Sequence, residues 1–322
     1  MTTTLWAQSA IVILGALHAL AAYAYFSRSR GAPVWALAWV AVAALAAWSV
    51  RIAPAVTAAT FGAAVVLWTL WWASIRALPH RKWIAENERQ ATGVVAGNVV
   101  TLHDVRSFDW RTKEDFSAHW EAAARIDLEA LEAVDLFTST WGEPRIAHLI
   151  VSFVFRDGTA PLAVSIETRR EADEAWTAFA GFMKAFELII VAARETDVIR
   201  LRTHIRGETV RRFRLRTTPS MRRKLFLQYV REMNALAVRP RFYNTLFANC
   251  TTEVARILRT TGRRLPWSWP LVVSGHVPRY FHGLGLVGPP SEHFEAVERA
   301  ADIGERARDD GSPLEFSQRI RA

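Results

Sequence analysis

The sequence has almost no cysteine and, over its first quarter, no acidic residue. Cys250 is the only cysteine in 322 residues, which excludes a disulfide framework and any zinc site built on several thiolates. Residues 1–75 contain no Asp or Glu and only three basic residues, yet they hold seven of the 14 tryptophans. A stretch so poor in charge is typical of a membrane-embedded part.

The remaining 247 residues have the charge of an ordinary water-soluble domain. They carry 37 basic residues, the 40 of the chain less those three, and 31 acidic residues. The net charge of +9 alone permits nucleic-acid binding, but no aromatic-interleaved or groove-reading motif accompanies it. We therefore expect no nucleic-acid partner, and the sequence gives no pattern for a metal site or a cofactor.

Three apolar runs predict transmembrane segments, because a bilayer is crossed by roughly 20 apolar residues in a helix. The runs are 5–26, 34–50 and 55–74. The domains expected from this pattern are a membrane part over 1–78, a linker over 79–96 and a soluble domain over 97–322.

The charges beside these runs bear on the side of the membrane. Arg28 and Arg30 follow the first run, and Arg76, Arg81 and Lys82 follow the third. With three spans these two places lie on one side, and the positive-inside rule then puts the soluble domain in the cytoplasm.

Two strand-like segments predict a hairpin that brings a histidine to a carboxylate. Residues 146–155 and 162–168 flank an Asp-Gly pair, which favours a type I′ turn because both central positions need positive φ. The register set by that turn pairs Phe153 with Leu162 and places His148 opposite Glu167. Opposed side chains lie roughly 5 Å apart at Cβ, so Glu167 would orient His148. A plain cross-strand polar contact is the alternative.

Cys250 lies at the expected start of a helix over 250–261. Asn249 is a good N-cap residue, and Val254, Ile257 and Leu258 share a helical face with Cys250. A helix N-terminus favours a thiolate, and its free N–H groups suit an oxyanion. The alternative is an inert cysteine in the apolar stripe of the helix.

Other segments give weaker predictions. Residues 119–137 favour a helix, or a strand and a helix, and 171–193 favour a helix followed by apolar chain. Residues 198–206 and 209–216 alternate as a hairpin, which would line up Arg200, Arg202 and Arg206 on one face. That face suits anionic lipid head groups, although a solvated basic face explains it equally. A further helix is expected over 221–237.

Several stretches together resemble a known family. They are WGEPRIAHLIVSFVF, LAVSIETRRE, FELIIVAARETDVIRLR, RFYNTLFANCTT and LEFSQRIR. With them the chain resembles the Lnb-type family of membrane-linked periplasmic proteins, and in its His–Glu–Cys order it resembles circularly permuted papain-like thiol enzymes of the NlpC type. The resemblance implies an α+β fold, with an antiparallel sheet and a Cys-bearing helix after the transmembrane helices.

The same resemblance implies roles for individual residues. Cys250 would be the nucleophile, His148 the general base and Glu167 its partner. Tyr243, Asn244 and Asn249, just before the cysteine, would contact substrate.

The founding activity of the family is lipoprotein N-acylation. It implies that Cys250 takes an acyl chain from a phospholipid of the bilayer as a thioester and passes it to an amine, such as a lipoprotein N-terminus. An NlpC-type peptidase or amidase acting on cell-wall peptides, and a non-catalytic membrane scaffold, are the alternatives. The resemblance also implies a multi-pass protein of the bacterial inner membrane with a periplasmic soluble domain, against the charge rule.

Overall fold

The computed structural model describes residues 2–26, 32–172, 174, 180–308 and 313–322. Two compact units divide the chain. A helical unit comprises Met1–Arg81, Arg170–Glu187 and Arg241–Thr245, and a sheet unit comprises Lys82–Arg169, Leu188–Pro240 and Leu246–Ala322. Each unit is made of three separate segments that alternate along the chain. The contiguous domain boundaries expected from the sequence stay a prediction.

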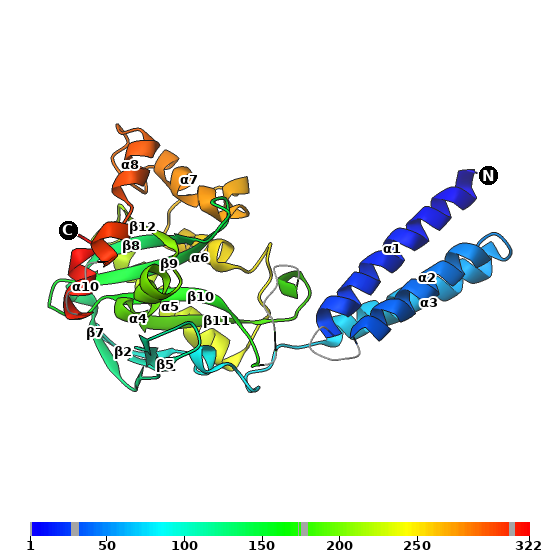
Figure 1. Ribbon diagram of the computed structural model, residues 1–322, viewed down its shortest axis with the longest axis horizontal. Coiled ribbons are helices and arrows are strands. Elements are labelled where there is room, and N and C mark those ends of the chain that lie inside the picture. The colour runs from blue at the N-terminus through cyan, green and yellow to red at the C-terminus, as the bar shows by residue number, and fades with distance from the viewer. Residues whose placement is uncertain (1, 27–31, 173, 175–179, 309–312) are drawn as a thin grey trace. The chain divides into compact units, whose positions relative to one another are not determined.

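The helical unit contains three apolar helices, drawn in blue in Figure 1: α1 (Thr2–Phe26), α2 (Ala32–Ser49) and α3 (Pro54–Ser74). Two of them are long and apolar enough to cross a membrane, over Leu5–Tyr23 and Pro54–Ser74. The apolar part of α2, Pro33–Ser49, is shorter. Three helices thus stand where three were expected, and the crossing by all three stays a prediction.

The sheet unit is built on a seven-stranded mixed sheet. Its strand order is β12-β8-β9-β10-β11-β3-β6, and a three-stranded sheet, β1-β2-β7, and a short pair, β4-β5, accompany it. The strands are β1 (Thr92–Ala96), β2 (Val99–His103), β3 (Val105–Arg106), β4 (Asp109–Trp110), β5 (Phe116–Ser117), β6 (Trp120–Glu121), β7 (Ala124–Asp127), β8 (Leu131–Thr140), β9 (Ala147–Phe155), β10 (Leu162–Arg169), β11 (Glu187–Arg194) and β12 (Thr209–Arg214).

Helices cover both faces of the large sheet (Figure 1). They are α4 (Glu195–Arg200), α5 (Pro219–Val238), α6 (Cys250–Arg259), α7 (Val277–Gly283), α8 (Phe294–Ala300), α9 (Gly304–Arg308) and α10 (Pro313–Arg319). Because side chains alternate along a strand, Phe153 of β9 packs edge-on against Phe226 and Tyr229 of α5. Ile150, three residues earlier on β9, points to the other face of the sheet, where it packs in a core with residues of α4, α9 and α10.

The predicted register of the hairpin is confirmed, although its turn is not the predicted one. Phe153 pairs with Leu162, and Ile150 pairs with Ser165. Of the Asp-Gly pair only Gly158 has a positive φ, 83°, so the turn is not type I′. The Asp157 carboxylate instead accepts from the Thr159 N–H at 3.0 Å.

Three local predictions were wrong. Strands and a short 3₁₀ turn occupy 119–137, where a helix, or a strand and a helix, was predicted, and the chain over 198–205 is helical rather than the first strand of a hairpin. Within 171–193 the structure has the 3₁₀ turn Ala180–Phe182 and strand β11; residues 173 and 175–179 of the predicted helix lie outside the described residues. The helix expected over 221–237 is confirmed as α5.

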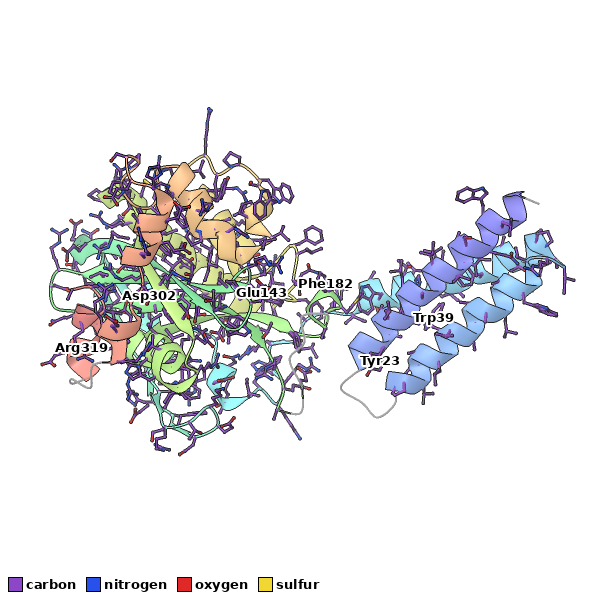
Figure 2. The ribbon with its side chains drawn as sticks, turned by 45° about the horizontal axis from the view of Figure 1, so that its top comes forward. Tyr23, Trp39, Glu143, Phe182, Asp302 and Arg319 are labelled. Carbon is purple, nitrogen blue, oxygen red and sulfur yellow. The ribbon has the colours of Figure 1, made fainter. Side chains whose placement is uncertain are left out.

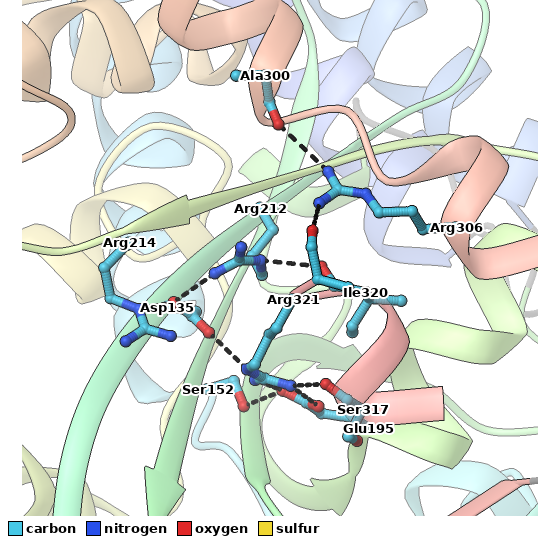
Figure 3. Close-up of polar contacts among 11 residues, drawn as sticks. Asp135, Ser152, Glu195, Arg212, Arg214, Ala300, Arg306, Ser317, Ile320 and Arg321 are labelled. Carbon is cyan, nitrogen blue, oxygen red and sulfur yellow. Dashed lines mark hydrogen bonds and ion pairs between the residues drawn. The ribbon is translucent and has the colours of Figure 1, made fainter. Parts of the chain in front are cut away.

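The C-terminal end of the chain is held by a buried charge network (Figure 3). The guanidinium of Arg321 donates to Asp135 Oδ2 at 3.0 Å and to Glu195 Oε2 at 2.8 Å. Both carboxylates are fully buried. Asp135 also accepts from Arg212 and Arg214 of β12, so the last turn of the chain, the sheet and the first residue of α4 are bound together.

Candidate active site

The ladder between β9 and β10 ends just before the predicted histidine and glutamate. Its last printed pair is Ile150 with Ser165, and His148 and Glu167 lie two residues further on. The side chains nevertheless meet, with 3.7 Å between His148 Nε2 and Glu167 Oε1. The predicted closeness of imidazole and carboxylate is therefore present.

Ser165 lies between the two side chains. Its hydroxyl donates to Glu167 Oε1 at 2.8 Å and lies 2.7 Å from His148 Nε2. An ionised carboxylate only accepts hydrogen bonds, so the single hydroxyl proton of Ser165 is directed at Glu167. We infer that the proton on the neutral ring is on Nε2, which leaves the lone pair on Nδ1.

Arg202 completes this cluster, and its predicted place on the exposed basic face of a strand is wrong. Its side chain is buried and donates to Glu167 Oε1 at 3.1 Å. Arg202 belongs to a π-helical turn, Leu201–Ile205, that continues α4. The Arg206 N–H donates to the Leu201 carbonyl, five residues earlier, at 2.9 Å. Single π turns are frequent at functional sites.

The π turn is held in place by an anchor at Asp197 of α4. Its fully buried carboxylate accepts from Arg106 Nε at 2.8 Å, from the Phe108 N–H at 3.0 Å and from Trp110 Nε1 at 2.8 Å. A buried charge with this many donors is strongly fixed. The anchor therefore determines where Arg202, five residues later, meets Glu167.

These contacts determine which groups are charged. Burial alone would raise the pKa of Glu167, but the charges of Arg202, His148 and Arg106, with the Ser165 hydrogen bond, outweigh it and lower that pKa to about 2. Burial and the positive charge of Arg202 lower the pKa of His148 to about 3, against the opposing effect of Glu167. Near neutral pH the cluster therefore holds a carboxylate, a guanidinium and a neutral imidazole.

Cys250 is the first residue of α6, which contacts both β9 and β10. Burial raises the pKa of its thiol, although the Leu149 N–H, the Thr251 side chain and the charge of Arg202 act in the opposite sense. The sulfur thus lies beside the residue that follows His148 and within the field of Arg202. Among the described residues its side-chain hydrogen-bond partner is Thr251 Oγ1 at 3.9 Å, and no hydrogen bond joins it to the His148 ring.

The three residues predicted to contact substrate have different surroundings. Asn249 caps α6, since its Oδ1 accepts from the Thr251 and Thr252 N–H groups at 2.8 Å each. Tyr243 belongs to the helical unit, where it packs against Ala180, Ala185 and Phe186. Asn244 belongs to that unit too. A role for any of the three in binding substrate stays a prediction.

No metal site accompanies the cluster: within the described part of the chain, His, Cys, Asp and Glu side chains nowhere gather in threes suited to an ion. The cluster is therefore one of a thiol, an imidazole, a hydroxyl, a carboxylate and a guanidinium.

Residues 117–275 match the family model of the Lnb N-terminal periplasmic domain. They contain β9, β10, the π turn and the start of α6, and so every member of the cluster. This part of the chain belongs to the Lnb-type family. No curated protein and no solved structure matches the chain. The name of the Lnb domain and the two long apolar helices together fit a membrane protein with a periplasmic domain.

Proposed function

We propose that the chain is a membrane-tethered thiol acyltransferase. Cys250 takes an acyl group from a phospholipid as a thioester and passes it to an amine, with a lipoprotein N-terminus as acceptor. The observation that carries the proposal is the cluster at the end of the β9–β10 ladder, where α6 brings the cysteine to the two strands that hold His148 and Glu167. In this proposal the Lnb domain is a permuted papain-like fold on the periplasmic side.

The first half-reaction uses the lone pair on His148 Nδ1. As the sulfur attacks the ester carbonyl carbon, Nδ1 takes the thiol proton, and the carbon–oxygen bond to the glycerol breaks. The departing oxygen receives that proton, so a lysophospholipid leaves and the acyl thioester remains. Thiol and imidazole are both neutral at rest, so proton transfer accompanies attack. Catalytic hydrogen bonds that are long or poorly aligned in a free enzyme tighten when substrate binds.

The second half-reaction reverses these movements. The amine nitrogen attacks the thioester carbon, the carbon–sulfur bond breaks, and the amine proton returns to sulfur through His148. Glu167 and Ser165 hold the ring throughout, and Glu167 stabilises the imidazolium as it forms.

The start of α6 supplies a donor for the oxyanion of both steps. The cap on Asn249 already uses the N–H groups of Thr251 and Thr252. The N–H of Cys250 itself is then the first-turn donor that faces the carbonyl oxygen attacked by its own sulfur.

Intact-protein mass spectrometry tests the proposal. The full chain in nanodiscs that contain phosphatidylethanolamine is expected to gain the mass of one acyl group less one hydrogen. Neutral hydroxylamine should remove that mass, because it cleaves thioesters, and Cys250→Ala should never acquire it. An added amine peptide should discharge the adduct and appear as the acylated product.

Two results would contradict the proposed acyltransferase activity. Absence of any adduct with wild-type protein would favour the cell-wall hydrolase, and release of free fatty acid without acylated amine would make the protein a lipid hydrolase. The matched control is Thr251→Ala, which alters the neighbouring side chain but keeps the thiol, and it should still form the adduct.

A further inference from the structure

Two loops of the sheet unit expose large apolar side chains. Trp141 and Ile146 lie in the β8–β9 connection, and Trp267, Trp269 and Val272 follow α6. Trp267 is 74% exposed, Trp269 is 57% exposed and Ile146 is 56% exposed. Single exposed apolar residues are normal on a protein surface, but several tryptophans in two joined loops point to a binding surface.

Hydrogen bonds join the two loops to each other. The Gly275 N–H donates to the Arg145 carbonyl at 2.9 Å, and the Ala147 N–H donates to Ser274 Oγ at 2.8 Å. The fit at Gly275 is tight, since an added Cβ would lie 2.3 Å from the Pro144 carbonyl oxygen. We call the surface made by Trp141, Ile146, Trp267, Trp269 and Val272 the aromatic face. Glu143, which lies in the first loop, is labelled in Figure 2.

The aromatic face adjoins the candidate active site. Ala147, which is tied to Ser274, directly precedes His148 on β9. The 3₁₀ turn Trp269–Leu271 contacts α6, the helix that begins with Cys250. A ligand that covers the aromatic face therefore lies at the strand end that holds the imidazole.

The composition of this face matches a bilayer surface. Tryptophan is enriched at the membrane–water interface, because its ring is apolar and its N–H stays hydrated. Arg263 and Arg264 are exposed and just precede the tryptophans of the second loop, and such guanidinium groups attract anionic lipid head groups.

The chain also keeps the sheet unit close to a membrane. The apolar helix α3 ends at Ser74 and the sheet unit begins at Lys82. The intervening residues 75–81 span at most about 25 Å when fully extended. If α3 crosses a bilayer, that tether gives the sheet unit a high effective concentration at its surface.

We propose that the aromatic face docks on the bilayer surface, with the tryptophans at head-group depth and Arg263 and Arg264 on anionic lipids. Docking would let an acyl donor enter beside His148, and this purpose rests on the proposed function. The docking itself does not require the thiol of Cys250.

Photo-crosslinking of the full chain in nanodiscs tests this proposal. The probe is a phosphatidylcholine with a diazirine near the top of one acyl chain, in membranes with or without phosphatidylglycerol. Labelled peptides are expected from 141–146 and 267–272, besides those from the apolar helices. The double variant Trp267→Ser, Trp269→Ser should lower loop labelling by more than about tenfold, since each large apolar side chain that becomes buried contributes a factor of about ten.

Matched variants separate docking from other causes. Val94→Ser with Val95→Ser removes two exposed apolar side chains of β1 and should leave loop labelling unchanged. Arg263→Gln with Arg264→Gln should abolish the increase that phosphatidylglycerol produces. Cys250→Ala should label like the wild type, so that failure of the thiol chemistry leaves this result standing.

Three outcomes would overturn the proposal. Labelling confined to residues 1–74 would show that the loops stay in water. Equal loop labelling in the tryptophan double variant would remove the aromatic face as the cause. Chain-to-chain adducts through these loops that rise with protein concentration would assign the face to a second copy instead.

Discussion

At His148 two charges of opposite sign compete, and burial decides the result. Glu167 would raise the pKa of the imidazole, but burial and Arg202 lower it to about 3. Glu167 is itself bound to Arg202, and its effect on the pKa of the imidazole is smaller than the effects of burial and of Arg202. The ring is therefore neutral over the whole physiological range, so its lone pair is available, but a pKa this far below neutral makes it a weak base for the buried thiol.

The lowered pKa of His148 predicts loss of stability in acid. Below pH 6.5, the ordinary histidine pKa, His148 becomes protonated in the unfolded chain, whereas in the folded chain it stays neutral down to about pH 3. The free energy of unfolding therefore falls as the pH falls. The slope from this group is at most about 1.4 kcal/mol per pH unit. Glu167 adds to the loss only below about pH 4.5, because its pKa falls from 4.5 to about 2 on folding.

Thermal unfolding of the full chain between pH 7 and pH 5 checks this prediction. The midpoint of the sheet unit should fall in the wild type and fall less in His148→Gln. His293→Gln, which changes an exposed histidine, should follow the wild type. Parallel curves for all three proteins would contradict the assigned pKa.

At the scale of elements, the start of α6 depends on one side chain. Asn249 accepts from two backbone N–H groups, and Thr252 Oγ1 accepts from the Asn249 N–H at 3.0 Å, which makes a reciprocal cap. We predict that Asn249→Ala lowers the free energy of unfolding by about 1 kcal/mol. Asn249→Asp should restore most of it, and the thermal midpoint measures both.

The same cap affects the thiol. With Asn249→Ala, the Thr251 and Thr252 N–H groups lose their acceptor and the first turn frays. Acyl-thioester formation at Cys250 should therefore slow in Asn249→Ala and recover in Asn249→Asp. An unchanged rate in both would assign the cap to folding alone.

Local sequence predicted the elements that carry Cys250, His148 and Glu167, because each has a strong short-range signal. The β9–β10 register follows from the short Asp-Gly connection between the two strands, and α6 follows from its cap and apolar stripe. The segment over 198–205 misled because alternating Arg and apolar residues imitate a strand. Its neighbours Val198 and Ile199 are buried in one core, which a strand would not allow but a helix does.

Arg202 could not have been assigned from the sequence for a related reason. Its place depends on Asp197, whose donors come from Arg106, Phe108 and Trp110, about 90 positions earlier in the chain. Such a contact has no local pattern. Similarly, Ala, Leu and Glu in 119–137 favour a helix, yet Leu131–Thr140 forms a strand between β9 and β12, because burial in the sheet outweighs intrinsic propensity.

At the scale of the whole molecule, the C-terminal residues support the candidate active site from a distance. Arg321 binds Glu195, the first residue of α4, and α4 leads into the π turn that holds Arg202. Two charge pairs therefore connect the C-terminal turn to the candidate active site. Arg321 binds Glu195 at the start of α4, and Arg202 in the π turn that continues α4 binds Glu167. The tail is part of the domain that presents the thiol cluster.

Arg321→Met tests this connection. Asp135 would keep Arg212 and Arg214, but Glu195 would keep only the hydroxyl of Ser152. A fully buried carboxylate without a cation costs several kcal/mol, so we predict a loss of about 3–5 kcal/mol in the free energy of unfolding. Thermal unfolding measures the loss, and thioester formation at Cys250 should fall with it. Adding Glu195→Gln removes the stranded charge and should restore most of the stability, whereas Arg321→Met as stable as the wild type would show that the network contributes nothing to the fold.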